Sequence, residues 1–190
     1  MNPSTALLLI DVQVGLDDPC WGARNNPGAE LVLGQVLAAW RHNGWPVVHV
    51  QHLSTNPRSP LRPGQPGVEL KLVVRPLGSE PVIQKQVNSA FIGTDLEARL
   101  RSAGIRRVVV GGLTTDHCVS STVRMAANLG FDVIVLADGT ATFGRTGPDG
   151  RAWTAEDLHG ATLASLDGEF ATVRQAREIL DSIGTAPAAG

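Results

Sequence analysis

Short apolar runs alternate with stretches of helical spacing along the chain, and this alternation limits the folds open to it. The apolar runs cover residues 6–10, 47–50, 82–83, 107–110 and 133–136. The helical patterns cover residues 30–42, 94–102, 118–129, 157–166 and 174–183. Strands that are apolar on both faces and joined by helices are typical of a parallel sheet covered on both sides. We therefore predict an α/β fold, a three-layer α/β/α sandwich with a mostly parallel, Rossmann-like central sheet of about six strands.

Glycines and prolines mark where these elements end. Gly44, Gly104 and Gly130 each follow a helical pattern, where a residue in the left-handed conformation commonly ends a helix. Residues 53–70 contain four prolines and no periodicity, so we expect a long loop that acts as a lid, a binding loop or a subunit contact. Residues 144–150 form a second Gly/Pro-rich segment, for which we expect a similar covering role.

The composition indicates one domain and a small partner. The chain has 190 residues, 43% of them hydrophobic, which is enough for a single core. We predict one domain over residues 1–184 and a disordered tail at 185–190. A net charge of −2 supplies no basic field for nucleic acid or an acidic membrane surface. No apolar stretch approaches the roughly 20 residues of a membrane helix, and residues 1–5 show no secretory signal, so we expect a cytoplasmic protein.

Three reactive side chains lie where a parallel sheet forms its ligand crevice, at the carboxyl ends of strands. Asp11 and Lys85 each follow a short apolar run, and Cys118 opens a helical pattern. A carboxylate that moves a proton, an ammonium that holds a charge and a thiol nucleophile together suit acyl transfer. A helix start and a nearby ammonium both favour the thiolate form of Cys118.

Each of these residues alone also has a structural explanation. Asp11 is a candidate helix cap, Lys85 a surface charge, and Cys118 a small buried hydrophobe, the commonest fate of a free cysteine. Cys20 lies in a turn without such a setting, and two cysteines in unlike contexts do not indicate a disulfide framework. The hypothesis of a catalytic site therefore depends on the conjunction of the three residues.

Three stretches of the chain resemble the isochorismatase-like cysteine hydrolase superfamily, which includes nicotinamidases and carbamoylsarcosine amidohydrolases. They are ALLLIDVQ at 6–13, VIQK with the following SAF and TDL at 82–96, and GGLTTDHCV at 111–119, with GFDVIVLAD after it. The resemblance spans nearly the whole chain. It implies a catalytic triad of Asp11, Lys85 and Cys118. It also implies an oxyanion hole from the backbone N–H groups of Thr114 and Cys118, with a cis peptide bond between Leu113 and Thr114.

The resemblance further implies a reaction and an assembly. The Cys118 thiolate attacks a carbonyl carbon to give a thioester, while Asp11 takes and returns protons. Family members that act on isochorismate replace the cysteine. The retained Cys118 therefore favours cleavage of a C–N bond in a small amide, ureido or carbamoyl compound, without a cofactor. Family members commonly assemble, so we expect a homo-oligomer, either a dimer or a tetramer.

The chain departs from the nicotinamidase pattern after the second strand. Nicotinamidases hold a metal there through an Asp-x-His motif and a later histidine, but this chain has no carboxylate between His49 and Ser54 and no histidine in the loop up to Leu70. Because strand side chains alternate, His49 and His52 point opposite ways. We therefore predict no metal, with His49 packed in the sheet.

A different substrate is also expected, because the phenylalanine that often follows the family's first motif is absent. The residues that we expect to line the substrate pocket lie near strand ends or in the covering loops: Gln13, Trp21, Gln51, His52 and Phe143.

Two alternative functions come from other classes. A thiol redox sensor or small-molecule binding protein would keep the fold without turnover and use Cys118 as an oxidisable thiolate. The retention of Asp11 and Lys85 disfavours it, because a sensor needs only the activated thiol. Nucleotide binding on a Rossmann-like sheet lacks its G-x-G-x-x-G fingerprint after residues 6–10.

Overall fold

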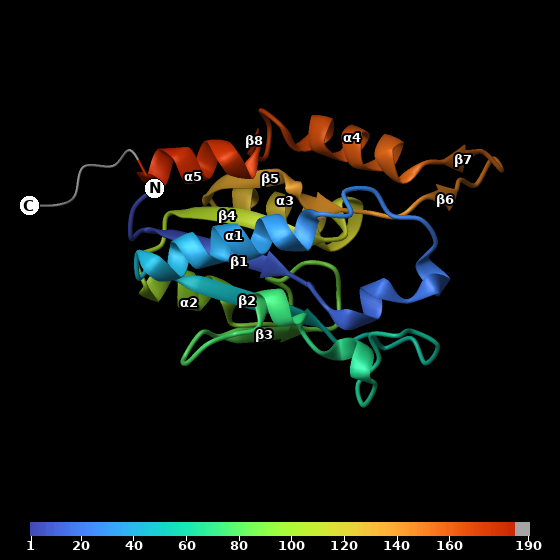
Figure 1. Ribbon diagram of the computed structural model, residues 1–190, viewed down its shortest axis with the longest axis horizontal. Coiled ribbons are helices and arrows are strands. Elements are labelled where there is room, and N and C mark those ends of the chain that lie inside the picture. Colours follow the sequence, from blue (N-terminus) through green and yellow to red (C-terminus); the bar gives the residue numbers. More distant parts are fainter. Residues whose placement is uncertain (185–190) are drawn as a thin grey trace, which may run out of the picture.

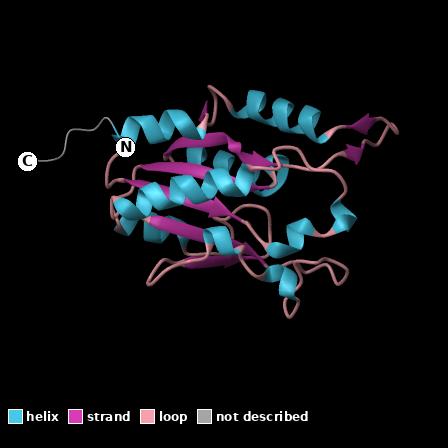
Figure 2. Cartoon of the chain, in the orientation of Figure 1, coloured by secondary structure: helices cyan, strands magenta, loops and turns pink. Residues whose placement is uncertain are grey.

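The computed structural model describes residues 1–184, which form a parallel sheet between two layers of helices (Figures 1 and 2). The sheet has six strands in the order β3-β2-β1-β4-β5-β8, and every neighbouring pair is parallel. The strands are β1 Thr5–Ile10, β2 Val47–His52, β3 Val82–Lys85, β4 Arg107–Leu113, β5 Asp132–Ala141 and β8 Thr172–Arg174. This architecture confirms the predicted three-layer α/β/α sandwich. The predicted tail at 185–190 lies outside the described residues.

Strand side chains alternate between two hydrophobic cores, one on each face of the sheet. Leu8 and Ile10 of β1 enter the first core, whereas Leu7 and Leu9 enter the second. Helices α2 Leu96–Ser102, α3 Ser120–Asn128 and α4 Ala155–Leu166 contribute buried side chains to the first core, and α1 Ala29–His42 and α5 Ala176–Gly184 contribute to the second. Because both faces are covered, the strands read as continuous apolar runs in the sequence.

The predicted elements are all present, with differences at their ends. Gly44, Gly104 and Gly130 have φ of 64°, 68° and 85°, which confirms the predicted left-handed helix ends. Strand β4 continues to Leu113, three residues beyond the apolar run at 107–110. The short strand β8 has no clear apolar run, because two of its three residues are exposed.

The two segments expected to be loops contain short regular pieces. The proline-rich segment holds a single turn of 3₁₀-helix, Pro66–Val68, within an otherwise irregular course. Beyond β5, the strands β6 Arg145–Thr146 and β7 Ala152–Trp153 form a small antiparallel hairpin. This hairpin projects from the end of the sheet at which β1 ends (Figure 1).

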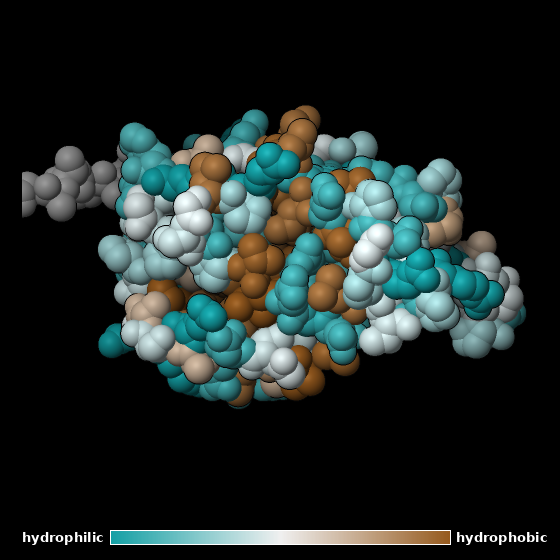
Figure 3. Space-filling model, turned by 90° about the horizontal axis from the view of Figure 1, so that it is seen from below, coloured by the Kyte–Doolittle hydropathy of each residue, from teal (hydrophilic) through white to brown (hydrophobic). Residues whose placement is uncertain are grey.

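Strand β3 forms one edge of the sheet, and several exposed large apolar residues lie on it or on the chain segments before and after it. Six such residues lie between positions 72 and 92: Leu72, Val73, Leu77, Val82, Val87 and Ile92. Figure 3 views the molecule from this side and shows apolar surface near the middle of the face. An unpaired edge strand with apolar side chains is a surface that proteins usually protect. Within residues 1–184, no helix has the length and apolar character needed to span a membrane.

Candidate active site

The sheet places its ligand crevice between β1 and β4. From β1 the chain proceeds outward through β2 and β3, whereas β4, β5 and β8 lie on the other side, so the strand order reverses between β1 and β4. In open α/β sheets, ligands bind at such a reversal, beyond the carboxyl ends of the strands. Asp11 directly follows β1, and the segment that carries Cys118 directly follows β4. These two predicted residues therefore flank the crevice.

Lys85 and Asp11 form a buried ion pair in this crevice. Lys85 Nζ lies 2.6 Å from Asp11 Oδ2, and the two residues are only 2% and 1% exposed. Burial raises the pKa of Asp11 above its usual 3.8, while Lys85 acts against that rise. Asp11 has a φ of 50°, in the left-handed region that aspartate tolerates better than most residues. Because of this backbone turn, the Asp11 side chain does not continue the alternation of side chains between the two faces of β1.

Cys118 lies in the first turn of the helical segment after β4, but its thiol is not activated in the way the sequence indicated. The segment is a π-helical turn, Thr115–Val119, which leads into α3. Burial raises the pKa of the Cys118 thiol to about 12, the Asp11 carboxylate adds to the rise, and Lys85 opposes it. The expected preference for thiolate is therefore wrong for the resting site. With its pKa raised, the thiol needs a base beside it to form the thiolate.

Asp11 is placed to be that base. The ligand-type atoms of Asp11, His52 and Cys118 all lie within 4.8 Å of one another. A carboxylate with a raised pKa is a stronger proton acceptor than an ordinary one. Asn88, on the loop after β3, also faces the thiol, with its Oδ1 3.9 Å from Cys118 Sγ.

The backbone between β4 and α3 has the form that the family resemblance implies. The Leu113–Thr114 peptide bond is cis. The N–H groups of His117 and Val119 both donate to the Thr114 carbonyl, which closes the turn around Cys118. The Thr114 hydroxyl oxygen is buried and, within the described chain, has no hydrogen-bond partner. Thr114 and Cys118 both line the cavity beside this turn.

A cavity of about 150 Å³ is lined by Cys118 and Asp11. Of the expected pocket residues, Trp21 and His52 line it, and Phe143 stacks behind Trp21 with ring centroids 5.9 Å apart. Gln13 and Gln51 do not line it. Their side-chain amides both donate to the Val68 carbonyl, so they hold the proline-rich loop against the sheet.

Sequence reasoning missed most of the remaining wall of this cavity. The missed residues are Leu16, Ser54, Ser59, Leu61, Asn88, Leu113 and His117. Three of them come from the segment 53–70, which supports its expected role as a binding loop. The only signal in the sequence was the length of that loop, because no local pattern shows which of its side chains turn inward.

The hairpin segment contributes to the site through His117. Arg145 of β6 donates to Nε2 of His117 at 2.6 Å and forms an ion pair with Asp116, also at 2.6 Å. Because a guanidinium can only donate, His117 Nε2 is an acceptor and its proton lies on Nδ1. Arg145, which belongs to the segment 144–150, therefore contacts the site through the cavity residue His117.

Asp11, His52 and Cys118 are residue types that bind metals, but a cation already lies among them. The Lys85 ammonium is 2.6 Å from Asp11 Oδ2 and 3.1 Å from His52 Nδ1. A metal would compete with this ammonium for the same two ligand atoms. His49 is fully buried, and its Nε2 bonds Glu80 on the other face of β2, so it cannot join the group.

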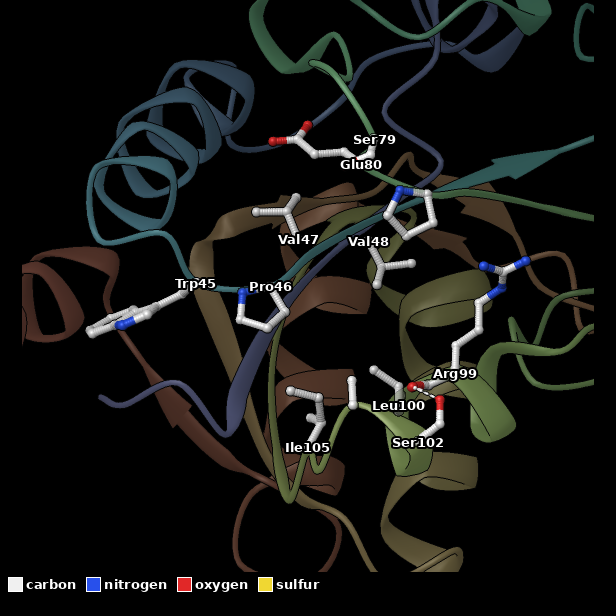
Figure 4. A pocket seen from close by; sticks show the side chains of 12 residues that line it. Trp45, Pro46, Val47, Val48, Ser79, Glu80, Arg99, Leu100, Ser102 and Ile105 are labelled. Carbon is white, nitrogen blue, oxygen red and sulfur yellow. Dashed lines mark hydrogen bonds between the residues drawn. The ribbon is translucent and has the colours of Figure 1, made fainter.

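A wider cavity lies at the opposite end of the strands, where they begin (Figure 4). It has a volume of about 410 Å³ and is lined by residues at the starts of β2, β3 and β4, among them Val47, Pro81 and Ile105. Amino ends of parallel strands are not where such folds bind substrates, and none of its lining residues is a cysteine, histidine or serine paired with a base. The smaller cavity around Cys118 is therefore the candidate active site.

Comparisons with known proteins agree with this architecture. The isochorismatase domain model matches residues 5–178. The isochorismatase family protein YrdC of Bacillus subtilis (strain 168) is 42% identical over 181 residues, covering 95% of this chain and 97% of the relative. A crystal structure of a hydrolase of the isochorismatase family from Chromobacterium violaceum superimposes with a TM-score of 0.93 at 48% identity, covering 97% of this chain and 96% of that one.

A third relative, streptothricin hydrolase of Streptomyces noursei, is 37% identical over 141 residues, which are 73% of this chain and half of that protein. On the family match across residues 5–178 and the close similarity to its members, this chain belongs to the isochorismatase family of hydrolases.

Proposed function

We propose that this protein is a cysteine-dependent amidohydrolase that cleaves the C–N bond of a small, uncharged amide, ureido or carbamoyl compound. The observation that carries the proposal is that Asp11 and Cys118, from distant segments, line one cavity at the reversal point of the sheet, while Lys85 Nζ lies 2.6 Å from the Asp11 carboxylate. A buried carboxylate, ammonium and thiol in contact are costly to maintain for stability alone. They are the groups that nucleophilic acyl transfer requires.

The reaction starts from the protonated thiol. The Cys118 proton passes to Asp11 as the sulfur attacks the carbonyl carbon, and backbone N–H groups of Thr114 and Cys118 hold the resulting oxyanion. Asp11 then gives the proton to the leaving amine, and the C–N bond breaks to leave a thioester. Asp11 next removes a proton from water, which attacks the thioester carbonyl carbon. The C–S bond then breaks, and Asp11 returns the proton to the sulfur, so that the acid is released and the thiol and carboxylate are restored. Lys85 stabilises the carboxylate form of Asp11 in each cycle.

The cavity limits the size and charge of the substrate. A cavity of about 150 Å³ in another protein holds a benzene molecule, so the group bound next to Cys118 has about that size. Among the described residues that line it, the acidic one is Asp11, whose charge Lys85 neutralises, and there is no lysine or arginine. Trp21, Leu16 and Leu61 supply apolar walls, while Asn88 and the serines of the proline-rich loop supply neutral hydrogen bonds.

The family relationship supports hydrolysis, and the cysteine chemistry is our extension of it. The relative named streptothricin hydrolase is a hydrolase by its name. The alternative role of Cys118 as a redox sensor is disfavoured by its raised pKa, because oxidation proceeds through the thiolate. A sensor also has no use for a buried base.

Ammonia release from a panel of small uncharged amides, ureido acid amides and carbamoyl compounds tests the proposal. Wild type is compared with Cys118→Ala and with Cys20→Ala, a control that removes the exposed cysteine. We expect at least one substrate whose turnover falls more than about 10³-fold in Cys118→Ala and is unchanged in Cys20→Ala. Turnover at the wild-type rate in Cys118→Ala contradicts the proposal. Silence of wild type across the panel, together with reversible oxidation of Cys118 by peroxide, favours the sensor instead.

A further inference from the structure

The side chain of Lys85 must cross one strand to reach its partner. Lys85 ends β3, whereas Asp11 follows β1, and β2 lies between them in the sheet. Neighbouring strands are about 4.8 Å apart, so β3 and β1 are separated by roughly 10 Å. His52 is the residue of β2 directly beside Lys85 in the parallel register. The lysine chain therefore passes His52 on its way to the carboxylate.

His52 contacts the ammonium at this crossing. Lys85 Nζ lies 3.1 Å from His52 Nδ1 and 2.6 Å from Asp11 Oδ2. An ammonium can only donate, so Nδ1 accepts and the imidazole is neutral, with its proton on Nε2. Burial, and then the charge of Lys85, lower the pKa of His52 to about 4, which keeps the ring neutral at physiological pH.

Gln13 fixes the backbone of His52 from the adjacent segment. The side-chain oxygen of Gln13 accepts from the His52 N–H at 2.8 Å, and its amide nitrogen donates to the His52 carbonyl at 3.1 Å. Gln13 is fully buried, so these bonds are shielded from water. These two bonds hold the backbone of His52 in place beside Lys85.

We propose that His52 is a positioning residue that fixes the ammonium of Lys85, so that one of its protons is directed to Asp11, one to His52 and the third to the sulfur of Cys118. The positive charge of Lys85 already opposes the rise in the pKa of Cys118. Without an acceptor at His52, the ammonium is free to rotate toward other partners and its interaction with the sulfur weakens. The role is indirect, because His52 acts on the nucleophile through Lys85.

The inference rests on the roles proposed for Lys85 and Cys118, and its test needs no substrate, so its failure is distinguishable from failure of the proposed function. The rate of Cys118 alkylation by iodoacetamide is measured from pH 7 to pH 11 in a Cys20→Ser background. The variants are His52→Leu, which removes the acceptor, and His52→Asn, whose amide oxygen can accept in the place of Nδ1. Gln84→Leu, next to Lys85 on β3 but exposed, is the matched control.

We expect His52→Leu to shift the alkylation profile about one pH unit upward, a loss of about tenfold in rate at pH 9, and His52→Asn to recover most of it. Gln84→Leu should follow wild type. In a Lys85→Met background, His52→Leu should add no further loss, because the ammonium on which it acts is gone. Circular dichroism confirms that each variant is folded. An unshifted profile in folded His52→Leu overturns the proposal, as does an equal loss in the presence and absence of Lys85.

Discussion

Lys85→Met tests the buried ion pair through stability rather than activity. The substitution keeps an unbranched side chain of similar length in a site that is 2% exposed, but it leaves the Asp11 carboxylate without its counter-charge. Breaking a buried pair by removing one partner costs about 3 to 5 kcal/mol, because a desolvated charge is left uncompensated. For a chain of this size, that loss corresponds to a fall in Tm of about 10 °C.

The loss should depend on pH in a defined direction. In Lys85→Met, burial acts on Asp11 without opposition, so its folded-state pKa rises further above the unfolded value of about 4. The folded variant then binds a proton that the unfolded chain releases. Its stability is fully present below the unfolded pKa and is lost as pH rises through the folded pKa. The deficit relative to wild type should therefore be large at pH 8 and much smaller at pH 5.

Urea unfolding followed by fluorescence of the four tryptophans measures this deficit at both pH values. The double variant Lys85→Met with Asp11→Asn removes both charges, and asparagine tolerates the left-handed backbone at this position. It should be more stable than Lys85→Met at pH 8. A deficit that is the same at pH 5 and pH 8, or a double variant no more stable than the single one, refutes the reasoning.

Three further predictions concern other parts of the molecule. Gly112→Ala should destabilise the protein by more than about 3 kcal/mol in thermal unfolding, because the added Cβ would lie 2.0 Å from the Ile10 carbonyl oxygen and the residue has a φ of 130°. Gly150→Ala should cost only about 1 kcal/mol, because the residue has a φ of 80° but open space around it. For Glu30, burial raises the pKa, but hydrogen bonds from Arg24 and Lys71 lower it to about 2 overall. This carboxylate should therefore contribute about 2 to 3 kcal/mol to the free energy of unfolding above pH 4.5, and that contribution should be lost as the pH falls toward 2. Urea titrations in which Glu30→Gln shows the same acid loss as wild type would contradict this. We also expect a homo-oligomer that buries the β3 edge. Light scattering should give a mass that is a multiple of 20.0 kDa for wild type and a smaller assembly for Ile92→Lys. A monomeric wild type would contradict this expectation.

The fold was readable from the sequence because its strands are buried on both faces. Runs such as 6–10 and 133–136 are apolar without interruption, and glycines stop the helices between them, so type and order of the elements follow from local pattern. Strand β8 was not predicted, because it has only three residues and two of their side chains are exposed, so it forms no apolar run. The reactive residues of the site were also readable, since Asp11 and Lys85 directly follow apolar runs.

The burial and the neighbouring charges of these residues could not be predicted from the sequence. The sequence indicates a helix start and an ammonium near Cys118, both of which favour thiolate, but the structure adds burial and a neighbouring carboxylate, which dominate. Gln13 and Gln51 lie near the crevice in sequence terms, yet their amides bond the backbone of the loop at Val68. Side-chain direction beyond a strand end depends on long-range contacts, which a single sequence does not show.

Intact-protein mass spectrometry during turnover tests the central claim most directly. Wild-type protein is quenched in acid within seconds of mixing with an amide that it hydrolyses, and the adduct is then mapped by proteolysis. The account predicts a mass increase equal to the acyl group of the substrate, located on the peptide that contains Cys118 and absent from Cys118→Ala. Hydrolysis that proceeds in Cys118→Ala, or an adduct on any residue other than Cys118, would contradict the thioester mechanism.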